Sequence, residues 1–141
     1  MKEVFLLKAG KREMWEYGDS VSVLKNGDFF KIRDFIQAGI LFEGESDVIM
    51  LHSHPVGFNQ FSQADTDTLI GLRLGLGLNF IAGIVFLNGK NETRYRLFDI
   101  RLKSKKVEIK EVGVIRNFVL GVWFNLHPIL QKIRQLSQYE Q

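Results

Sequence analysis

Two short apolar runs constrain what this chain can fold into. Residues 48–51 (VIML) and 80–87 (FIAGIVFL) are rich in β-branched and aliphatic side chains. Each run is far shorter than the roughly 20 residues that a membrane-spanning helix needs, so we expect two buried strands. Between them, residues 62–76 place apolar side chains at helical spacing, with Leu69, Leu72 and Leu76 expected to face inward.

The flanking segments predict further strands and helices. We expect strands at 3–8, 12–17, 20–24, 93–102 and 106–112, and helices at Phe29–Phe42 and Val114–Ser137. Asp28 is expected to cap the first of these helices, and Pro128 to kink or split the last one. The pattern therefore predicts an α/β fold, with a mixed β-sheet flanked by helices and a C-terminal amphipathic helix.

Length and composition favour one compact domain over residues 1–141, with 45% hydrophobic residues. The absence of cysteine excludes disulfides, thiolate zinc sites and a cysteine nucleophile. No segment reads as a signal peptide or a membrane span, so we expect a cytoplasmic protein without membrane association. The net charge of +3 is spread along the chain, and the densest basic run (residues 101–106) reads as a solvated turn. We therefore do not expect a nucleic-acid partner.

The chemistry concentrates just after the first buried run. His52 and His54 are two residues apart on an expected strand, so both imidazoles point to the same face and can chelate one ion. Asp65 can fold back over the strand end and supply a carboxylate. Two imidazoles and one carboxylate suit Zn²⁺ and leave a fourth position for water, which is typical of a catalytic rather than a structural site.

Several of these residues also have purely structural interpretations. Ser62 and Asp65 resemble a helix-capping box, although a fixed Ser62 hydroxyl can still serve chemistry. Phe58 and Phe61 lie between the candidate ligands and could shape a substrate groove or simply anchor the loop. We interpret His127 as a histidine on the surface of the last helix.

The segment His52-Ser53-His54-Pro55, followed by six residues and Ser62-x-x-Asp65, resembles the motif of the JAMM (MPN-type) metalloproteases. The resemblance implies a cytidine-deaminase-like fold, with a metal-motif core over about residues 3–90 and a hairpin and helix over about residues 91–141. It also implies Zn²⁺ held by His52, His54 and Asp65, with Ser62 stabilising the tetrahedral intermediate.

The resemblance further implies an upstream glutamate that acts as general base. In this family that residue begins an early strand, just before a hydrophobic run. Glu3, in Glu3-Val-Phe-Leu-Leu, fits this place. Glu13, Glu16, Glu43 and Glu45 remain alternatives.

The function implied by the resemblance is zinc-dependent, deubiquitinase-like hydrolysis of peptide or isopeptide bonds. Its substrate would be an extended peptide tail or a ubiquitin-like protein. The chain also resembles the RadC-related branch of the superfamily, although Ser53 stands where that branch usually has Asn, so a nucleic-acid-associated role stays open. A third alternative is a non-catalytic MPN scaffold that binds a protein partner or a second copy through the C-terminal helix. The complete ligand set argues against that alternative.

Overall fold

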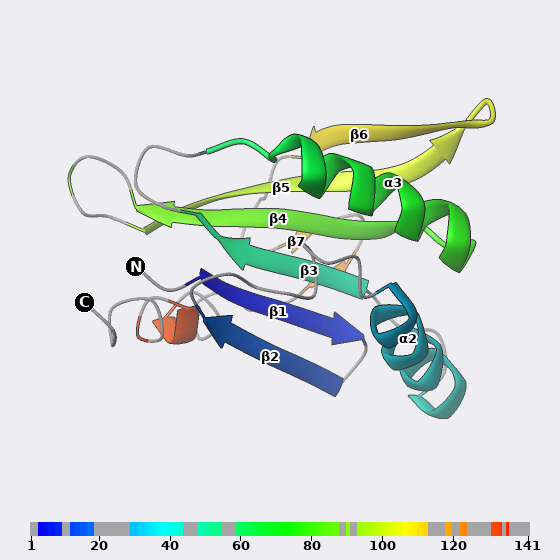
Figure 1. The fold of residues 1–141 in the computed structure, drawn as a ribbon, viewed down its shortest axis with the longest axis horizontal. Helices are drawn as coiled ribbons and strands as arrows, with labels where there is room; N and C mark the ends of the chain where they lie inside the picture. Colours follow the sequence, from blue (N-terminus) through cyan, green and yellow to red (C-terminus); the bar gives the residue numbers. More distant parts are fainter. Residues whose placement is uncertain are drawn as a thin grey trace.

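The computed structural model describes residues 3–9, 12–18, 29–43, 48–54, 59–87, 90, 93–112, 118–119, 122–123, 131–133 and 135. Six strands form one mixed sheet in the order β2-β1-β3-β4-β5-β6 (Figure 1). These strands are β1 (Glu3–Ala9), β2 (Arg12–Gly18), β3 (Val48–Ser53), β4 (Phe80–Leu87), β5 (Thr93–Lys103) and β6 (Lys106–Val112). The helices are α2 (Phe29–Glu43) and α3 (Gln63–Leu76). The predicted α/β class with a mixed sheet is confirmed.

The strands β3 and β4 are parallel, whereas the other neighbouring pairs of this sheet are antiparallel. Parallel neighbours require a long crossover connection, and α3 supplies it. The backbone N–H of His54 donates to the carbonyl oxygen of Val85 at 2.8 Å, which extends the β3–β4 contact one residue beyond β3. The crossover therefore leaves the sheet at the end of β3 that carries both histidines.

Both helices cover the same face of the sheet, in front of the strands in Figure 1. Their buried residues pack against alternate strand residues: Ile32, Ile36, Leu69 and Leu72 from the helices, with Phe5, Leu7, Met50, Ile84, Phe98 and Ile100 from the strands. A second buried cluster lies on the other face, formed by Val4, Leu6, Ile49, Leu51, Ile81, Val85, Leu97 and Ile133. Because β3 is buried on both faces, its sequence is a continuous apolar run rather than an alternating one.

The helix α3 has defined signals at both ends. Ser62 is its N-cap, with an extended backbone and a side chain that accepts a hydrogen bond from the backbone of Asp65. Gly77 ends it with a φ of 71°, a left-handed conformation that glycine adopts without steric cost. The prediction of a helix opened by Ser62 is confirmed, as is the burial of Leu69 and Leu72.

The C-terminal amphipathic helix predicted over residues 114–137 is not confirmed. Within the helix expected over residues 114–137, Phe118–Val119 and Val122–Trp123 form a two-stranded antiparallel pair, β7 and β8. These aromatic and β-branched residues favour strands over helix. Among the later described residues, 131–133 and 135 have helical backbone, in agreement with the prediction.

Other expectations fall outside the described residues. These are the strand at 20–24, the Asp28 cap, and the environments of Pro128 and His127. Within the described part of the chain, no helix is both long and apolar enough to cross a membrane.

Candidate metal centre

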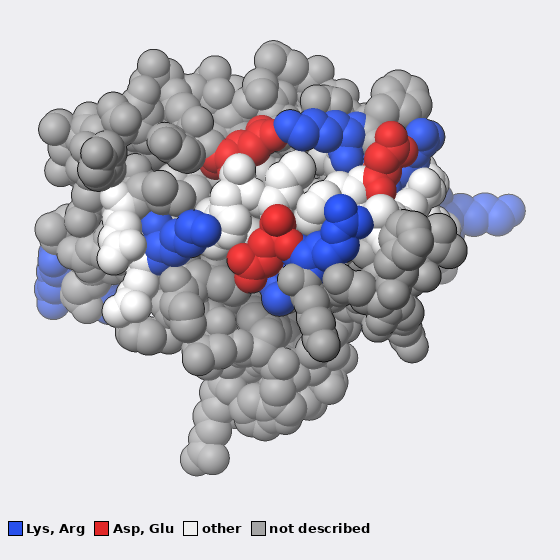
Figure 2. Space-filling model, turned by 90° about the horizontal axis from the view of Figure 1, so that it is seen from below, with Lys and Arg blue, Asp and Glu red and all other residues white. Residues whose placement is uncertain are grey.

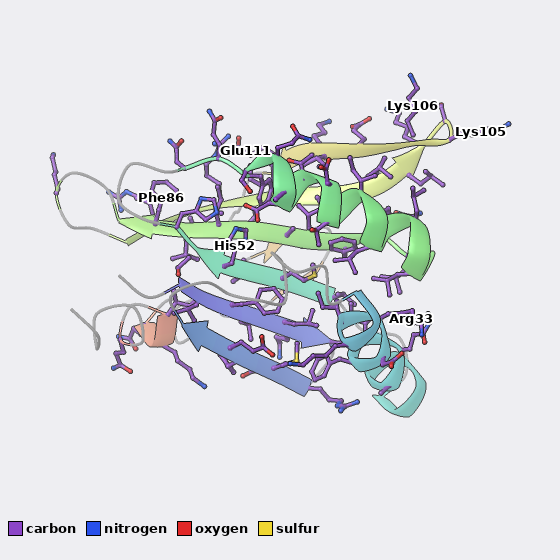
Figure 3. All side chains as sticks on the ribbon, viewed as in Figure 1. Arg33, His52, Phe86, Lys105, Lys106 and Glu111 are labelled. Carbon is purple, nitrogen blue, oxygen red and sulfur yellow. The ribbon has the colours of Figure 1, made fainter. Side chains whose placement is uncertain are left out.

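The two histidines and Asp65 converge on one point at the end of β3. The Nε2 atoms of His52 and His54 are 2.6 Å apart. The Oδ2 atom of Asp65 lies 3.2 Å from the His52 Nε2 and 3.4 Å from the His54 Nε2. His52 and Asp65 are buried, and Figure 3 shows His52 near the end of strand β3. These three residues could hold a metal ion.

The donor set fits a small divalent cation. Nitrogen and oxygen ligands about 2.0–2.1 Å from a tetrahedral zinc ion stand about 3.3–3.4 Å from each other. The two separations that involve Asp65 match this value, and the histidine nitrogens would need to separate by about 0.7 Å.

The capping box of α3 also orients the Asp65 carboxylate. The Asp65 backbone N–H donates to the Ser62 Oγ at 3.1 Å, and the Ser62 backbone N–H donates to the Asp65 Oδ2 at 3.0 Å. This Oδ2 is the same oxygen that faces the histidines. Ser62 therefore lies beside Asp65 with an exposed side chain, and the capping box uses its hydroxyl oxygen as an acceptor.

Asp65 carries a negative charge despite its burial. Burial opposes ionisation, but hydrogen bonds with His52 and His54, the charge interaction with His52 and the Ser62 backbone N–H together outweigh it. The pKa of Asp65 consequently lies well below its usual range. A carboxylate that is ionised in this way is a competent ligand for a cation.

The first strand approaches the same end of β3. Phe5 pairs with His52 in the antiparallel register, and the Val4 backbone N–H donates to the buried Ser53 Oγ at 2.7 Å. The hydroxyl of Ser53 thus replaces a backbone carbonyl where the β1–β3 ladder ends. Glu3 is the first residue of β1, two residues before Phe5. Because strand residues two apart lie on the same face of the sheet, the position of Glu3 is on the same face as Phe5. Its side chain is outside the described part of the structure.

The alternative glutamates have different positions. Glu13 pairs with Lys8, which lies at the strand parity opposite to Phe5, and it accepts a hydrogen bond from the Trp15 indole at 3.1 Å. Glu16 lies opposite Phe5 on β2, two strands from His52, and contacts Lys31 of α2. Two strand spacings are about 10 Å, which separates Glu16 from the ligand group.

Glu43 and Glu45 precede the other end of β3. Glu43 is the last residue of α2, and β3 begins at Val48. His52 lies four residues further along the strand, a rise of about 13 Å. The side chain of Glu43, like the whole of Glu45 and Phe58, is outside the described residues.

Phe61 anchors the segment between the ligands. Its ring stacks on the His52 imidazole, with centroids 5.9 Å apart, and contacts the Phe98 ring at 4.8 Å. The Arg96 guanidinium covers Phe98 and donates to the backbone oxygen of Asn59 at 2.6 Å. The sequence analysis did not identify Arg96 or Phe98. Both lie in β5, more than 30 residues from the motif, and no local signal marks their contact with it.

Among the described residues, the basic side chains at the β5–β6 turn lie away from this centre. Lys105 and Lys106 lie at the β5–β6 turn, away from His52 in Figure 3. On the face that Figure 2 shows, described Lys and Arg side chains lie beside Asp and Glu side chains. Lys8 pairs with Glu13 at 3.8 Å, and Arg33 pairs with Asp34 at 3.3 Å.

Comparison of the sequence with known proteins identifies no relative. No family model matches the chain, and no curated protein matches it in sequence. The resemblance to the JAMM metalloproteases therefore rests on the motif from His52 to Asp65 and on the convergence of its three ligand atoms.

Proposed function

We propose that this protein is a zinc-dependent hydrolase of the JAMM type that cleaves peptide or isopeptide bonds. The observation that carries the proposal is the convergence of the Nε2 atoms of His52 and His54 with the Asp65 Oδ2 at the end of β3. A cytidine-deaminase-like fold is part of the proposal. It is supported by the mixed sheet and by the β3–α3–β4 crossover that carries the ligands.

Glu3 and Ser62 have separate roles in the proposed hydrolysis, beside the three residues that would hold Zn²⁺. When bound, Zn²⁺ supplies a Lewis acid that polarises the substrate carbonyl and makes water a usable nucleophile near neutral pH. We assign the base to Glu3, whose carboxylate takes the proton from the attacking water. The Ser62 hydroxyl donates a hydrogen bond to the carbonyl oxygen as that oxygen gains negative charge.

Three structural observations support Glu3 over the other glutamates. Phe5 pairs with His52, and Glu3 shares its strand parity. The bond from the Val4 N–H to Ser53 ties the start of β1 to the histidine strand. Glu13 accepts a hydrogen bond from Trp15 of β2, and Glu16 accepts one from Lys31 of α2.

The substrate class follows from the resemblance. We propose an extended peptide tail, such as the flexible end of a ubiquitin-like protein. An extended chain is most simply held by strand addition beside the active-site sheet, which excludes folded polypeptide next to the scissile bond. The interspersed charges of Figure 2 favour this substrate over a nucleic acid, which is usually met by a concentrated basic surface.

The proposal is tested with Glu3→Gln and the matched control Glu16→Gln in the zinc-loaded protein. Glutamine keeps the shape of glutamate but accepts no proton, so Glu3→Gln should lower turnover by about 10²–10⁴-fold while zinc stays bound. Glu16→Gln, on the neighbouring strand, should retain turnover. The assay uses ubiquitin-like fusions and conjugates beside unrelated extended peptides. Loss of turnover in Glu16→Gln but not in Glu3→Gln would refute the assignment of the base. A wild type without stoichiometric zinc would refute the proposed function.

A further inference from the structure

Arg96 joins three parts of the molecule that are distant in sequence. Its Nε and Nη2 atoms donate to the Glu111 Oε1 at 3.0 Å and Oε2 at 2.7 Å, which makes a two-bond ion pair between β5 and β6. Its Nη1 atom donates to the backbone oxygen of Asn59 at 2.6 Å. One guanidinium thus ties the edge strand of the sheet to the segment that connects His54 with Ser62.

A second route runs from Arg96 to the ligands through aromatic rings. The guanidinium carbon lies 5.1 Å from the centre of the Phe98 ring. Phe98 contacts Phe61 at 4.8 Å, and Phe61 stacks on the His52 imidazole with an interplanar angle of 27°. The row of rings therefore begins under Arg96 and ends on a candidate metal ligand.

Both routes restrict the ligand atoms. Asn59 lies three residues before Ser62, so a fixed Asn59 carbonyl limits where α3 can begin and hence where the Asp65 carboxylate stands. The Phe61 ring limits rotation of the His52 imidazole. We infer that Arg96 is a positioning residue, whose contacts with Glu111, Asn59 and Phe98 hold His52 and Asp65 at the separation that a bound cation requires. This inference rests on the proposed metal centre.

The guanidinium is needed for this arrangement. Its planar fork presents donors in several directions at once, whereas a lysine ammonium is a compact charge that cannot reproduce the two bonds to Glu111 together with the bond to Asn59. The hydrogen bonds between the partners raise the pKa of Arg96 and lower the pKa of Glu111, so both remain charged.

The contribution to overall stability is expected to be small. The side chains of Arg96 and Glu111 are 30% and 49% exposed, and solvent screens such pairs. A residue that only stabilised the fold would change the melting temperature and the metal affinity together. A positioning residue should change metal affinity with little effect on melting.

The test compares Arg96→Lys with Arg73→Lys. Arg73 is a matched control because it makes a 2.8 Å hydrogen bond to Asn79 at the other end of α3. Zinc affinity is measured by competition with a chromophoric chelator, coordination geometry by the visible absorption of the Co²⁺-loaded protein, and stability by thermal melting of the metal-free protein. We expect Arg96→Lys to weaken zinc binding by about 10-fold, as for other residues that support ligands, and to alter the Co²⁺ spectrum. Its melting temperature should stay close to that of Arg73→Lys.

A second variant keeps the test independent of the folding of Arg96→Lys. Glu111→Gln retains a hydrogen-bond acceptor on an exposed residue but removes the charge, so it should weaken zinc binding by less than Arg96→Lys does. Wild-type zinc affinity and an unchanged Co²⁺ spectrum in both variants would overturn the inference alone. A wild type that binds no zinc would overturn the proposed function, and the inference with it.

Discussion

A single oxygen atom of Asp65 has two roles at the residue scale. Its Oδ2 accepts the hydrogen bond of the Ser62 backbone N–H that closes the capping box, and it also faces the nitrogens of both histidines. A backbone donor cannot be lost by side-chain substitution, so the orientation of this ligand depends on where α3 begins. Helix capping and metal binding are consequently coupled through one atom, and they can be separated by choice of variant.

Asp65→Asn and Ser62→Ala should give opposite patterns. In Asp65→Asn the side-chain amide oxygen can still accept from the Ser62 N–H, so the helix start is retained, but the neutral side chain is a poor cation ligand. We expect loss of stoichiometric zinc while the hydrogen bond from the Ser62 backbone is kept. Ser62→Ala removes the cap acceptor and should destabilise the protein by about 1 kcal/mol, with zinc retained. Elemental analysis and urea denaturation of the metal-free proteins measure the two effects. Equal zinc in wild type and Asp65→Asn would remove Asp65 from the site.

Ser53 gives a second prediction at this scale. Its buried Oγ is the acceptor for the Val4 N–H, so Ser53→Ala leaves a buried donor without its partner. Such a loss costs about 1–3 kcal/mol, and the midpoint of urea denaturation should fall accordingly. Ser53→Thr retains the hydroxyl and serves as the control. If Ser53→Ala and Ser53→Thr unfold at the same denaturant concentration, the hydrogen bond does not stabilise the start of β1.

At the element scale, the sheet is tightly packed where β3, β4 and β5 meet. A Cβ atom on Gly83 of β4 would lie 2.6 Å from the Cδ2 atoms of Leu51 and Leu97 and 2.8 Å from the backbone oxygen of Arg96. The leucine ends can rotate, but the backbone oxygen belongs to the β4–β5 ladder and cannot move without disturbing it. Glycine at position 83 allows β5, which carries Arg96, to lie close to β4, the neighbour of the histidine strand β3.

Gly83→Ala and Gly71→Ala should therefore change stability in opposite directions. Gly83→Ala overpacks the sheet and should lower the free energy of unfolding by about 1–3 kcal/mol. Gly71 lies on the exposed side of α3, and a Cβ there would meet no atom within 4 Å. Gly71→Ala should raise the free energy of unfolding by about 0.5–1 kcal/mol, because alanine favours the helix. Denaturation curves of the two variants measure both effects, and a stabilised Gly83→Ala protein would contradict the packing argument.

Elements whose ends or burial are marked by nearby residues could be predicted from the sequence. Ser62 and Asp65 mark the start of α3, and the run from Val48 to Leu51 marks a strand buried on two faces. Residues 118–123 could not be assigned from sequence, because their apolar side chains satisfy helical spacing, whereas their β-branched and aromatic character favours the β7–β8 pair. Helical spacing and strand propensity therefore predict different structures for this segment, and its local sequence does not decide between helix and strand.

At the scale of the whole molecule, the strand order and the support of the site depend on contacts between distant segments. The convergence of His52, His54 and Asp65 could be predicted because these residues lie within fourteen consecutive positions. The contact of Arg96 with Asn59 spans 37 residues, and it exists only because β5 lies beside β4 in the sheet. Sequence spacing does not show that β5 lies beside β4, so the roles of Arg96 and Phe98 can be recognised only from the assembled sheet.

Zinc binding should stabilise the whole folded chain, because the ligands come from β3 and α3 and converge only when both have folded. A ligand that binds only the folded state stabilises it by about 2.7 kcal/mol at 100 times its dissociation constant. For a chain of this length we expect the melting temperature to rise by on the order of 10 °C. Differential scanning calorimetry with zinc and with a chelator measures the difference. No difference at neutral pH would contradict a metal site built from these elements.

The size of this zinc-induced shift should decrease in acid. The depressed pKa of Asp65 means that its stabilising contribution is present above the ordinary aspartate range and is lost only as pH falls through the lower, folded-state value. Between about pH 7 and about pH 5, Asp65 is thus ionised in both the folded and the unfolded chain and contributes no pH dependence. Imidazole nitrogens bind a metal only when they are neutral, so metal binding weakens in acid and the shift should shrink as the pH falls. Calorimetry of Asp65→Asn at both pH values gives the baseline without the metal. A zinc-induced shift of the same size at both pH values would mean that histidine nitrogens do not bind the ion.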